Sequence, residues 1–278
     1  MKTVLHQVYI PHPALREFVV SFITVDAVLP ESMDTVVTPY PPAPHQSFIF
    51  YGDHSIKMKK EGSSSFELQP SIVVVGPQFT RVNLMVMKRL KAVRVDFHPG
   101  GLYRLLRIPM THLYDGGFDA FDVIGNEIRS INQQLLDAPD MELSKNIVEN
   151  FLLKKIKNLK EALPFDGAMR QLLLNDGNIP IEKIASLACL SLRQFERKCT
   201  ERIGIPPKAF ARIARFSKAY RIREAKPDLT WTAIAYEAGY FDQMHLIRDF
   251  KEFAGVTPRI IEEALAGTPF RMQAHLLV

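Results

Sequence analysis

Two short stretches of the sequence combine arginine with glutamine or apolar side chains, at spacings that place them on the outer face of a helix. The outward positions are Arg193, Gln194, Glu196 and Arg197 in the first stretch, and Gln243, Met244, Ile247 and Arg248 in the second. Arginine can donate two hydrogen bonds to guanine, and glutamine can pair with adenine in the same bidentate manner. Side chains of this kind on a short exposed helix are suited to the major groove of DNA.

Each stretch is preceded by a signal for the start of a helix. In the first, Ser191 is a good N-cap and Gln194 follows three residues later, which is the spacing of a capping box. In the second, Asp242 is the expected cap. The turns before these caps are Cys189-Leu190 and Gly239-Tyr240-Phe241. We therefore expect each stretch to be the second helix of a helix-turn-helix unit.

The two units are copies of one another. Ile184-Ala185 matches Ile234-Ala235 at an offset of 50 residues, whereas Pro207 matches Pro258 at an offset of 51. One residue has therefore been inserted in one of the two turns. Chance does not usually keep apolar, alanine, glycine and proline positions in step on both sides of an insertion. We expect a duplicated fold rather than a plain helical bundle.

The net charge of +5 is concentrated around the first unit and the segment that follows it. Residues 193–226 hold 11 Lys and Arg against 3 Asp and Glu. Such a local excess is typical of a surface that binds nucleic acid, although a solvated helix face has the same composition. We expect one long helix over Pro207–Ala225, with Lys208, Arg212 and Arg215 in contact with phosphates.

Residues 166–268 resemble the DNA-binding domain of the AraC/XylS family of bacterial transcription regulators. The resemblance is carried by Ile184-Ala185, Leu190 to Arg197, Gly204-Ile205-Pro206-Pro207, Ile234 to Gln243, Phe250-Lys251 and Gly255-Val256-Thr257-Pro258. It implies seven helices, with two helix-turn-helix units joined by one long helix. It also implies that the helices at 192–203 and 243–253 enter successive major grooves. The eight outward residues named above would then contact bases, and His245 would contact a phosphate.

The sequence departs from the family pattern at several positions. Cys199 stands where phenylalanine is usual, so that part of the core is less filled, and Ile260-Ile261 replaces the usual aromatic residue. Met244 and Ile247 are apolar where polar base-contacting residues are common. Hydrogen bonding to bases by the second unit is therefore in doubt, while contact with thymine methyl groups stays open.

The first ~100 residues are rich in short β-branched and aromatic runs. Runs at 48–51, 71–75, 82–87 and 92–97 stop at or just before glycine or proline breakers in most cases, which is typical of a barrel or a sandwich. Prolines at positions 39, 41, 42 and 44 predict an irregular loop before the first of them. After these runs, the spacing of apolar residues predicts helices over 121–135 and 143–160.

The fold class expected from these patterns is α+β with two domains. We expect a barrel-like, β-rich domain at 1–160, an all-α domain with two helix-turn-helix units at 165–268, and a C-terminal tail at 269–278. The helix at 143–160 carries an apolar stripe with two interpretations. It packs against its own domain, or it pairs with a second copy of the chain, and we favour the homodimer.

The first domain is expected to sense a small molecule. Phe97-His98-Pro99-Gly100-Gly101 and the residues after it resemble an uncharacterised sensor-like domain found ahead of such regulators, over about 10–135. Aromatic side chains could line an apolar pocket there, or simply fill the core. These are Phe48, Phe50, Tyr51, Phe97 and Tyr103.

An alternative function is a cupin-like ligand-binding protein or metal enzyme with a helical accessory domain. Its candidate metal ligands are His45, His54 and His98, with Asp53 and Asp96. They lack the H-x-H spacing of such sites, so we expect no catalytic residue, no metal and no cofactor. A helical protein–protein adaptor is a third class, and it would show no salt-dependent affinity for DNA.

Composition excludes several other classes. Apolar residues make up 47% and charged residues 23%, which excludes a disordered or fibrous chain. No apolar run approaches the ~20 residues of a membrane span, and the N-terminus lacks a signal peptide, so we expect a cytoplasmic protein. Two cysteines, expected to be buried thiols, exclude a disulfide scaffold. The expected partners are double-stranded DNA, an unknown small-molecule effector, a second copy of the chain, and RNA polymerase if the protein is an activator.

Overall fold

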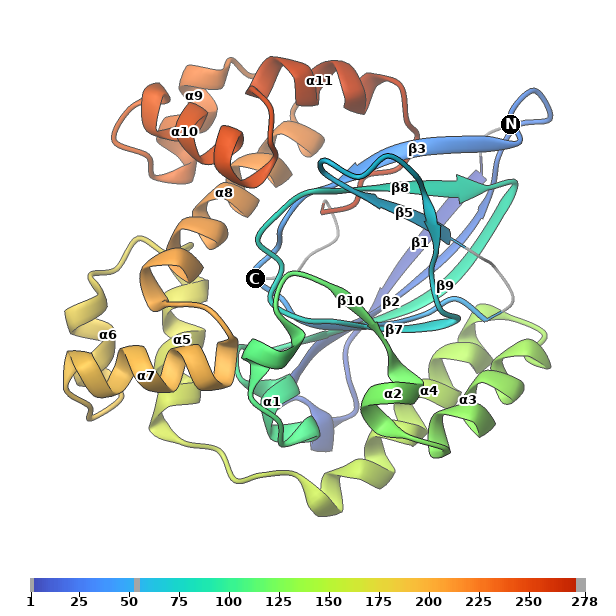
Figure 1. Ribbon diagram of the computed structural model, residues 1–278, viewed down its shortest axis with the longest axis horizontal. Coiled ribbons are helices and arrows are strands. Elements are labelled where there is room, and N and C mark those ends of the chain that lie inside the picture. The colour runs from blue at the N-terminus through green and yellow to red at the C-terminus, as the bar shows by residue number, and fades with distance from the viewer. Residues whose placement is uncertain (1–2, 53–55, 274–278) are drawn as a thin grey trace.

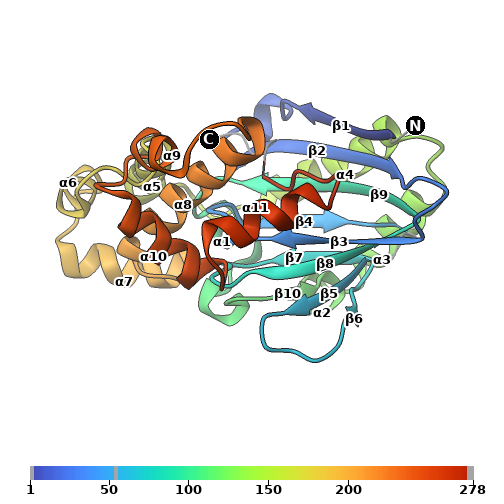
Figure 2. The same ribbon diagram turned by 90° about the horizontal axis from the view of Figure 1, so that it is seen from above.

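The computed structural model describes residues 3–52 and 56–273 (Figure 1). A β-rich half is followed by a helical half, and the stretch from 159 to 163 between them contains no helix or strand. The two halves lie side by side, with the helices of the second half at one end of the sheets (Figures 1 and 2). No helix in the described part of the chain is long and apolar enough to cross a membrane.

The β-rich half contains two antiparallel sheets that face each other. The larger runs in the order β1-β2-β9-β4-β7-β10, and the smaller in the order β3-β8-β5-β6. The larger sheet is built from β1 (Thr3–Tyr9), β2 (Val19–Val28), β4 (Ser47–Phe50), β7 (Ile72–Val75), β9 (Arg89–Phe97) and β10 (Gly117–Asp119). The smaller is built from β3 (Thr35–Tyr40), β5 (Ile56–Lys60), β6 (Glu67–Leu68) and β8 (Val82–Met87). The two sheets are not closed into a barrel, so the expected barrel-like domain is an open sandwich.

Alternation along the strands divides the apolar side chains between two cores. On β9, Val93, Val95 and Phe97 point toward covering helices, whereas Leu90 and Ala92 point toward the smaller sheet. The helices on the outer face of the larger sheet are α1 (Gly101–Leu106), α2 (Ala120–Ile124), α3 (Glu127–Leu136) and α4 (Met141–Lys155). The larger sheet is therefore covered on both faces by apolar side chains.

Several elements differ from the sequence-based expectation. The helix predicted over 121–135 is broken at Gly125, which has a left-handed φ of 94° and separates α2 from α3. The helix predicted over 143–160 ends at Lys155 and continues as a 3-10 helix over Ile156–Asn158. In its apolar stripe, Val148, Phe151 and Leu152 are buried in the core of its own domain, whereas Leu143 is 43% exposed. The homodimer through this stripe stays an untested prediction.

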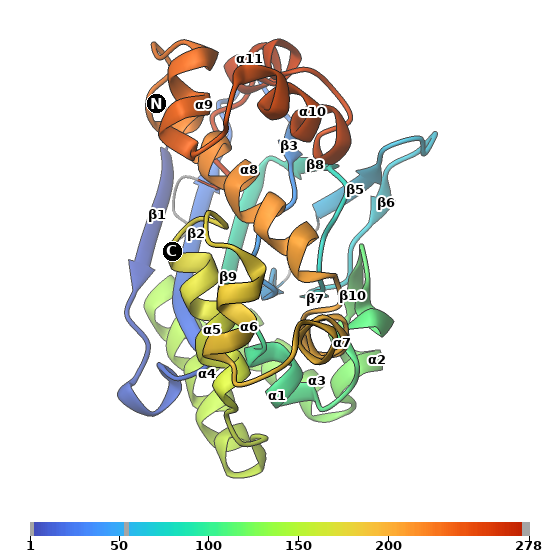
Figure 3. The same ribbon diagram turned by 90° about the vertical axis from the view of Figure 1, so that its left-hand side faces the viewer.

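The helical half consists, within the described residues, of the seven helices that the resemblance implies. They are α5 (Pro164–Leu174), α6 (Ile181–Leu187), α7 (Leu192–Ile203), α8 (Pro207–Ala225), α9 (Trp231–Ala238), α10 (Gln243–Phe253) and α11 (Pro258–Ala266). Helix α8 runs diagonally between the group α5–α7 and the group α9–α11 (Figure 3). These helices share one apolar core, and Phe210, Phe216 and Tyr220 of α8 are buried in it.

The residues after α11 return to the β-rich half. The side chain of Phe270 is 1% exposed and packs with the apolar residues between the two sheets. Gln273 donates hydrogen bonds from its amide to the carbonyl oxygens of Pro41 and Pro42, at 3.2 and 2.9 Å. Its own amide oxygen accepts a hydrogen bond from Ser217 of α8 at 2.7 Å. The segment 270–273 therefore belongs to the cores of both halves, rather than forming a free tail.

Candidate nucleic-acid interface

The first helix-turn-helix unit consists of α6, a short turn and α7. Cys189 in the turn has a left-handed φ of 54° and is exposed, so it is not the buried thiol that we expected. Ser191 then caps α7: its hydroxyl accepts a hydrogen bond from the Gln194 backbone N–H, and the Gln194 amide oxygen accepts one from the Ser191 backbone N–H. This is the predicted capping box, and it determines where α7 begins.

The inner face of α7 attaches the unit to the core. Phe195 and Cys199 are both fully buried. The Cys199 thiol donates a hydrogen bond to the Ile205 carbonyl oxygen at 3.2 Å, and burial raises the pKa of this thiol well above its ordinary value. Cys199 is therefore an uncharged core residue. Helix α7 ends at Gly204, whose φ of 91° requires a residue without a side chain.

The second unit repeats this arrangement with α9 and α10. Gly239 has a φ of 87° at the position that Cys189 occupies in the first turn. The Asp242 carboxylate accepts hydrogen bonds from the backbone N–H and the ring of His245, both at 2.8 Å. These bonds lower the pKa of Asp242, so the cap stays charged. Both predicted caps are confirmed, and α10 begins at Gln243 as predicted.

The outward side chains of the first unit are mostly accessible. Arg193, Gln194 and Arg197 are exposed, and Glu196 is half-exposed. Within residues 3–52 and 56–273, neither Arg193 nor Arg197 forms an ion pair. Gln194 keeps its two N–H donors although its oxygen is used in the cap. This surface has the donors that base edges require.

The outward side chains of the second unit are less uniform. Met244 and Arg248 are exposed, whereas Gln243 and Ile247 are half-buried. The Gln243 amide oxygen accepts a hydrogen bond from the Thr232 hydroxyl at 2.7 Å, and Ile247 packs against the helical core. The structure thus divides the four predicted residues into two that face solvent and two that face α9 or the core.

The basic residues of α8 have acidic or polar partners inside the domain. Arg212 pairs with Asp249 at 2.7 Å and with Glu252 at 2.5 Å, both on α10. Arg215 donates hydrogen bonds to the Asn178 side chain and the Gly177 carbonyl oxygen, at 2.9 and 3.1 Å. These two arginines hold α8 to the second unit and to the loop before α6. Lys208, at the start of α8, is exposed.

The two helices with outward arginines lie on the same side of α8. Figures 2 and 3 both place α7 and α10 toward one side and α9 toward the other. Helix α8 contacts α7, α9 and α10, so it determines how far apart the two units lie. The helical half therefore presents two exposed, capped helices with basic residues on a common side.

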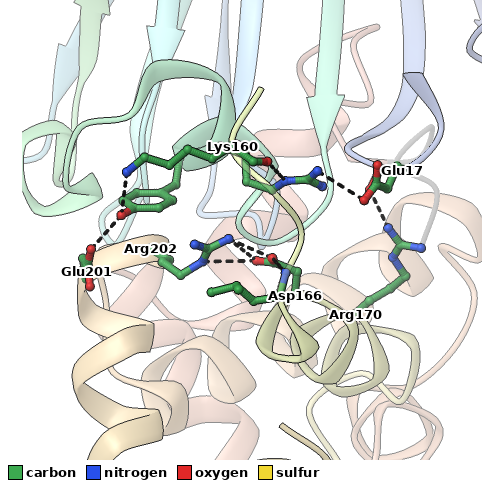
Figure 4. Close-up of polar contacts among 9 residues, drawn as sticks. Glu17, Lys160, Asp166, Arg170, Glu201 and Arg202 are labelled. Carbon is green, nitrogen blue, oxygen red and sulfur yellow. Dashed lines mark hydrogen bonds and ion pairs between the residues drawn. The ribbon is translucent and has the colours of Figure 1, made fainter. Parts of the chain in front are cut away.

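A cluster of ionic side chains attaches α7 to the β-rich half (Figure 4). The Tyr103 hydroxyl of α1 donates to the Glu201 carboxylate at 2.6 Å and accepts from the Lys160 ammonium at 3.0 Å. The Arg202 guanidinium lies 4.6 Å from the Tyr103 ring centroid and pairs with Asp166 of α5 at 2.7 Å. Arg202 and Asp166 are 5% and 12% exposed in their side chains, so this ion pair is almost fully desolvated.

A neighbouring set of contacts attaches α5 to the same part of the β-rich half. Arg104 pairs with the Glu17 carboxylate at 3.2 Å and donates to the Lys160 carbonyl oxygen at 2.7 Å. Arg170 of α5 donates to the Glu17 carbonyl oxygen at 2.7 Å. Figure 4 shows Arg170 beside Glu17 and Arg202 beside Asp166. The first unit and α5 are thus fixed to the β-rich half through charged side chains.

The segment from 76 to 81, which we call the coupling segment, touches both units. A side chain at Gly204 would meet Pro77 at 2.5 Å, so the end of α7 packs directly on this segment. Phe79 packs edge-on against Phe253 at the end of α10, with ring centroids 5.2 Å apart. Asp115 organises the segment by accepting hydrogen bonds from the backbone N–H groups of Phe79 and Thr80, both at 2.8 Å.

An apolar pocket opens between the two sheets next to the coupling segment. Its apolar wall is formed by Tyr40, Ile49, Tyr51, Met58, Val73, Val75, Val82 and Leu84, and its polar rim by Lys60, Gln69, Gln78 and Asp115. Gln78 belongs to the coupling segment, and Asp115 holds that segment in place. A molecule in this pocket would therefore lie against Gln78 and Asp115, and their neighbours Pro77 and Phe79 contact the ends of α7 and α10.

The five aromatic residues expected to line a pocket have different surroundings. Phe48, Phe50 and Phe97 are at most 1% exposed and belong to the core under the covering helices, on the opposite face from this pocket. Tyr51 lines the pocket between the sheets. Tyr103 belongs to the ionic cluster at α7. Consecutive side chains alternate between the two faces of the sheet, so Phe50 lies under the helices and Tyr51 lies between the sheets. The sequence alone did not show which of these faces contains the pocket.

The alternative metal site has no support in the geometry of the described residues. His45 is buried, and burial lowers the pKa of its ring, which lies 3.4 Å from the Phe97 carbonyl oxygen. Asp96 pairs with Arg94 at 2.6 Å. Among the residues that the structure describes, no three or more His, Cys, Asp and Glu side chains are placed to hold a metal ion. His54 and Asp53 lie outside the described residues.

Two structural features of the candidate interface were not found by sequence reasoning. The coupling segment has no motif of its own, and its contacts with Phe253 and Gly204 join residues far apart in sequence. Phe241 was placed in a turn, but its 86% exposure was not anticipated. The change of the repeat offset from 50 to 51 is the sequence signal that could have identified Phe241.

Two family models match separate parts of the chain. A helix-turn-helix domain matches residues 169–263, and a domain of unknown function (DUF6597) matches residues 7–119. The first covers both units described above, and the second covers most of the sandwich. Among curated proteins, no sequence matches this chain.

Solved structures with a similar path of the chain include ToxT from Vibrio cholerae. It is 14% identical, with 89% of this chain and 99% of that chain covered and a TM-score of 0.47. A structure of ToxT with an unsaturated fatty acid bound is also 14% identical, with 86% and 98% covered and a TM-score of 0.46. The AraC-like transcriptional activator CuxR is 12% identical, with 89% and 80% covered and a TM-score of 0.23.

Proposed function

We propose that this chain is a DNA-binding transcription regulator of the AraC/XylS family, and that α7 and α10 occupy two consecutive major grooves of a duplex. The family assignment is supported by the helix-turn-helix match over 169–263, which lies after a domain of unknown function matched over 7–119. The observation that carries the proposal is the placement of two capped, arginine-bearing helices on one side of α8. One turn of B-DNA separates equivalent groove positions by about 34 Å.

We assign the base contacts of the first unit to Arg193, Gln194, Glu196 and Arg197, because they share the accessible face of α7. In the second unit, Met244 and Arg248 have the access that base contact requires, and Gln243 and Ile247 contact bases only at the edge of the interface. Lys208 and His245 are exposed and are assigned to phosphates. Arg212 and Arg215 reach phosphates only with N–H groups that their acidic and amide partners leave free.

Removal of one arginine from each unit tests the proposal. A duplex is first selected from a random-sequence pool with the full chain. For Arg197→Ala and Arg248→Ala we expect a loss of about 1–3 kcal/mol in binding that duplex, with relaxed base preference in one half-site only. Arg89→Ala, which removes the same charge from the β-rich half, is the control. Unchanged affinity and base preference in both variants would contradict the DNA-binding assignment.

A small molecule bound between the sheets is the proposed signal. The support is the contact of the pocket residue Gln78 and of Asp115 with a segment that reaches the ends of both α7 and α10. Occupation of the apolar pocket would move this segment and so change how the two units are placed relative to DNA. A thermal-shift screen of small apolar compounds should find ones that raise Tm for the natural chain but not for Met58→Trp, whose indole fills the pocket. A screen without any such compound would argue against this step.

RNA polymerase and a second copy of the chain are the other proposed partners. A regulator that activates transcription must contact RNA polymerase, and we place the protein in the cytoplasm, where bacterial DNA lies. A homodimer would not use Val148, Phe151 and Leu152 of α4, because these side chains are buried within the chain. Sedimentation of the full chain with and without its selected duplex measures this oligomeric state.

A further inference from the structure

The exposed surfaces of the two units differ in chemistry at the ends that would enter a groove. In the first unit the polar side chains of Arg193, Gln194 and Arg197 are exposed, and the apolar side chain of Leu192 is 37% exposed. At the corresponding end of the second unit, Met244 is 58% exposed and Phe241, in the turn just before the cap, is 86% exposed. An exposed apolar patch on a folded protein usually marks a surface that is covered by a partner.

Phe241 is the extra residue in the turn of the second unit. Tyr240 corresponds to Leu190 and the cap Asp242 corresponds to the cap Ser191, so Phe241 has no counterpart in the first unit. Within the described residues no large apolar side chain is more exposed. A residue before the cap often packs against the fourth residue of the helix as a hydrophobic staple. Here that fourth residue, Leu246, is fully buried by other contacts and Phe241 stays in solvent.

The surroundings of this patch favour DNA as its partner. Arg248 and Lys251 are exposed on the following turns of α10 and form no ion pair within the described part of the chain. Two uncompensated cations next to an apolar patch fit a duplex better than an apolar protein surface. The patch is also continuous with the helix end that the proposed function places in a major groove. The apolar group that a base pair presents there is the C5-methyl of thymine.

We infer that the second unit recognises a thymine-containing half-site through contacts of Phe241 and Met244 with thymine methyl groups. The first unit recognises its half-site by hydrogen bonds instead. This inference rests on the proposed DNA-binding function and adds the chemistry by which one half-site is distinguished. The duplicated fold thus combines two different modes of base recognition on one scaffold.

Deoxyuridine tests the inference, because it lacks only the C5-methyl of thymidine and keeps the same hydrogen-bonding groups. In the selected duplex each thymine is replaced by deoxyuridine, one position at a time. We expect the affinity of the full chain to fall about fourfold for each contacted methyl in the second half-site, the effect of burying one such group. Replacements in the first half-site should leave the affinity unchanged.

Phe241→Ala identifies the protein side of the contact. Its high exposure means that truncation leaves no cavity, and Leu68→Ala, which removes another exposed apolar side chain from β6, is the matched control. In the Phe241→Ala variant the deoxyuridine effect at one position should disappear, as a double-mutant cycle requires of a direct contact. The control should keep the full effect.

The outcomes separate the inference from the function on which it rests. If no selective binding to any duplex is found, the DNA-binding assignment fails. If binding is selective but deoxyuridine has no effect in the second half-site, methyl recognition is overturned and the regulator assignment survives. A loss of affinity in Phe241→Ala with no deoxyuridine effect would also overturn it, because the ring would then act on another part of the duplex.

Discussion

The two helix-turn-helix units have the same internal construction but different attachments to the rest of the chain. In both, a capped second helix, two buried apolar side chains and a left-handed glycine at or near the helix end are repeated. The first unit is fixed to the β-rich half by the desolvated Arg202–Asp166 pair and the Tyr103–Glu201 hydrogen bond. The second is held by the half-exposed Arg212. Duplication has therefore preserved the fold of each unit, while the charged residues around it have diverged.

This difference has a consequence for signalling between the halves. The ionic cluster in Figure 4 joins the end of α7 to α1 and to the segment after α4, so the first unit follows any movement of the β-rich half. The second unit touches that half through the aromatic contact of Phe79 with Phe253 and through Glu61 near Gly255, and α11 beside it contacts β3. An apolar contact has no strict angular preference compared with a bidentate ion pair. We therefore expect the second unit to have more freedom to change its position.

The largest difference between the attachments should appear when the buried ion pair of the first unit is broken. For Asp166→Ala we expect the free energy of unfolding to fall by about 3–5 kcal/mol, because Arg202 would be left buried without its partner. Asp166 also accepts the Leu163 backbone N–H at the start of α5, which adds to the loss. Urea denaturation of the full chain measures the change.

The control for this variant is Glu263→Ala, which breaks the exposed Arg259–Glu263 pair on α11. The two side chains of that pair are 86% and 66% exposed, so we expect a change below about 0.5 kcal/mol. Equal stability losses in Asp166→Ala and Glu263→Ala would show that the ionic cluster does not fix the first unit.

A smaller effect is expected from Arg212, the corresponding anchor of the second unit. Arg212→Ala should lower the free energy of unfolding by about 1–2 kcal/mol, because this pair is more exposed and Asp249 keeps its hydrogen bond from the Tyr240 hydroxyl. If the Arg212 guanidinium is engaged by its partners on α10 and not by a phosphate, DNA affinity should depend on salt in this variant as it does in the natural chain. The measurements are urea denaturation and titration of the selected duplex at several salt concentrations.

Lys208→Ala is the matched variant, because Lys208 lies on the same helix and is exposed. It should reduce the salt slope by about one unit, as the loss of one phosphate contact requires, with little change in stability. A reduced salt slope in Arg212→Ala, equal to that of Lys208→Ala, would assign Arg212 to phosphate and remove it from the attachment of α10.

The smallest effect concerns the hydroxyl of Tyr103. Tyr103→Phe keeps the ring against Arg202 but removes the hydrogen bonds with Glu201 and Lys160, and should cost about 0.5–1.5 kcal/mol. Hydrogen exchange should speed up at the end of α7 and stay the same at the end of α10. Faster exchange in both helices would mean that the two units are attached to the β-rich half in the same way.

The helical half could be predicted almost completely from the sequence, and the β-rich half only in part. Caps, glycine ends and repeat offsets are local signals, and they placed α7, α8 and α10 at the observed residues. Strand β3 was predicted to be a loop because it contains Pro39. It lies at the edge of its sheet, where a missing N–H donor is tolerated. Strands β1 and β2 were not among the individual strands predicted, although they lie in the stretch expected to be β-rich.

The exposure of the candidate site residues was predictable, whereas their contacts with DNA stay predictions. Arg193, Arg197 and Arg248 are accessible as their helical spacing predicts. The partners of Arg212 and Arg215 could not be predicted, because Asp249 and Asn178 each lie 37 residues away along the chain. Helical spacing identifies neighbours within one helix. It does not identify the carboxylate or amide groups that tertiary folding places next to an arginine.

The return of the chain after α11 limits how the protein can be divided for experiments. Phe270 completes the apolar interior of the sandwich, and the backbone N–H groups of Met272 and Gln273 are held by Glu224 of α8 at 3.0 Å. A fragment that ends at residue 160 would lack Phe270 in its apolar interior. A DNA-binding fragment that includes Phe270 would expose this aromatic ring to solvent. The segment 270–273 therefore joins the two halves, and we expect truncation of either half to lower the stability of both.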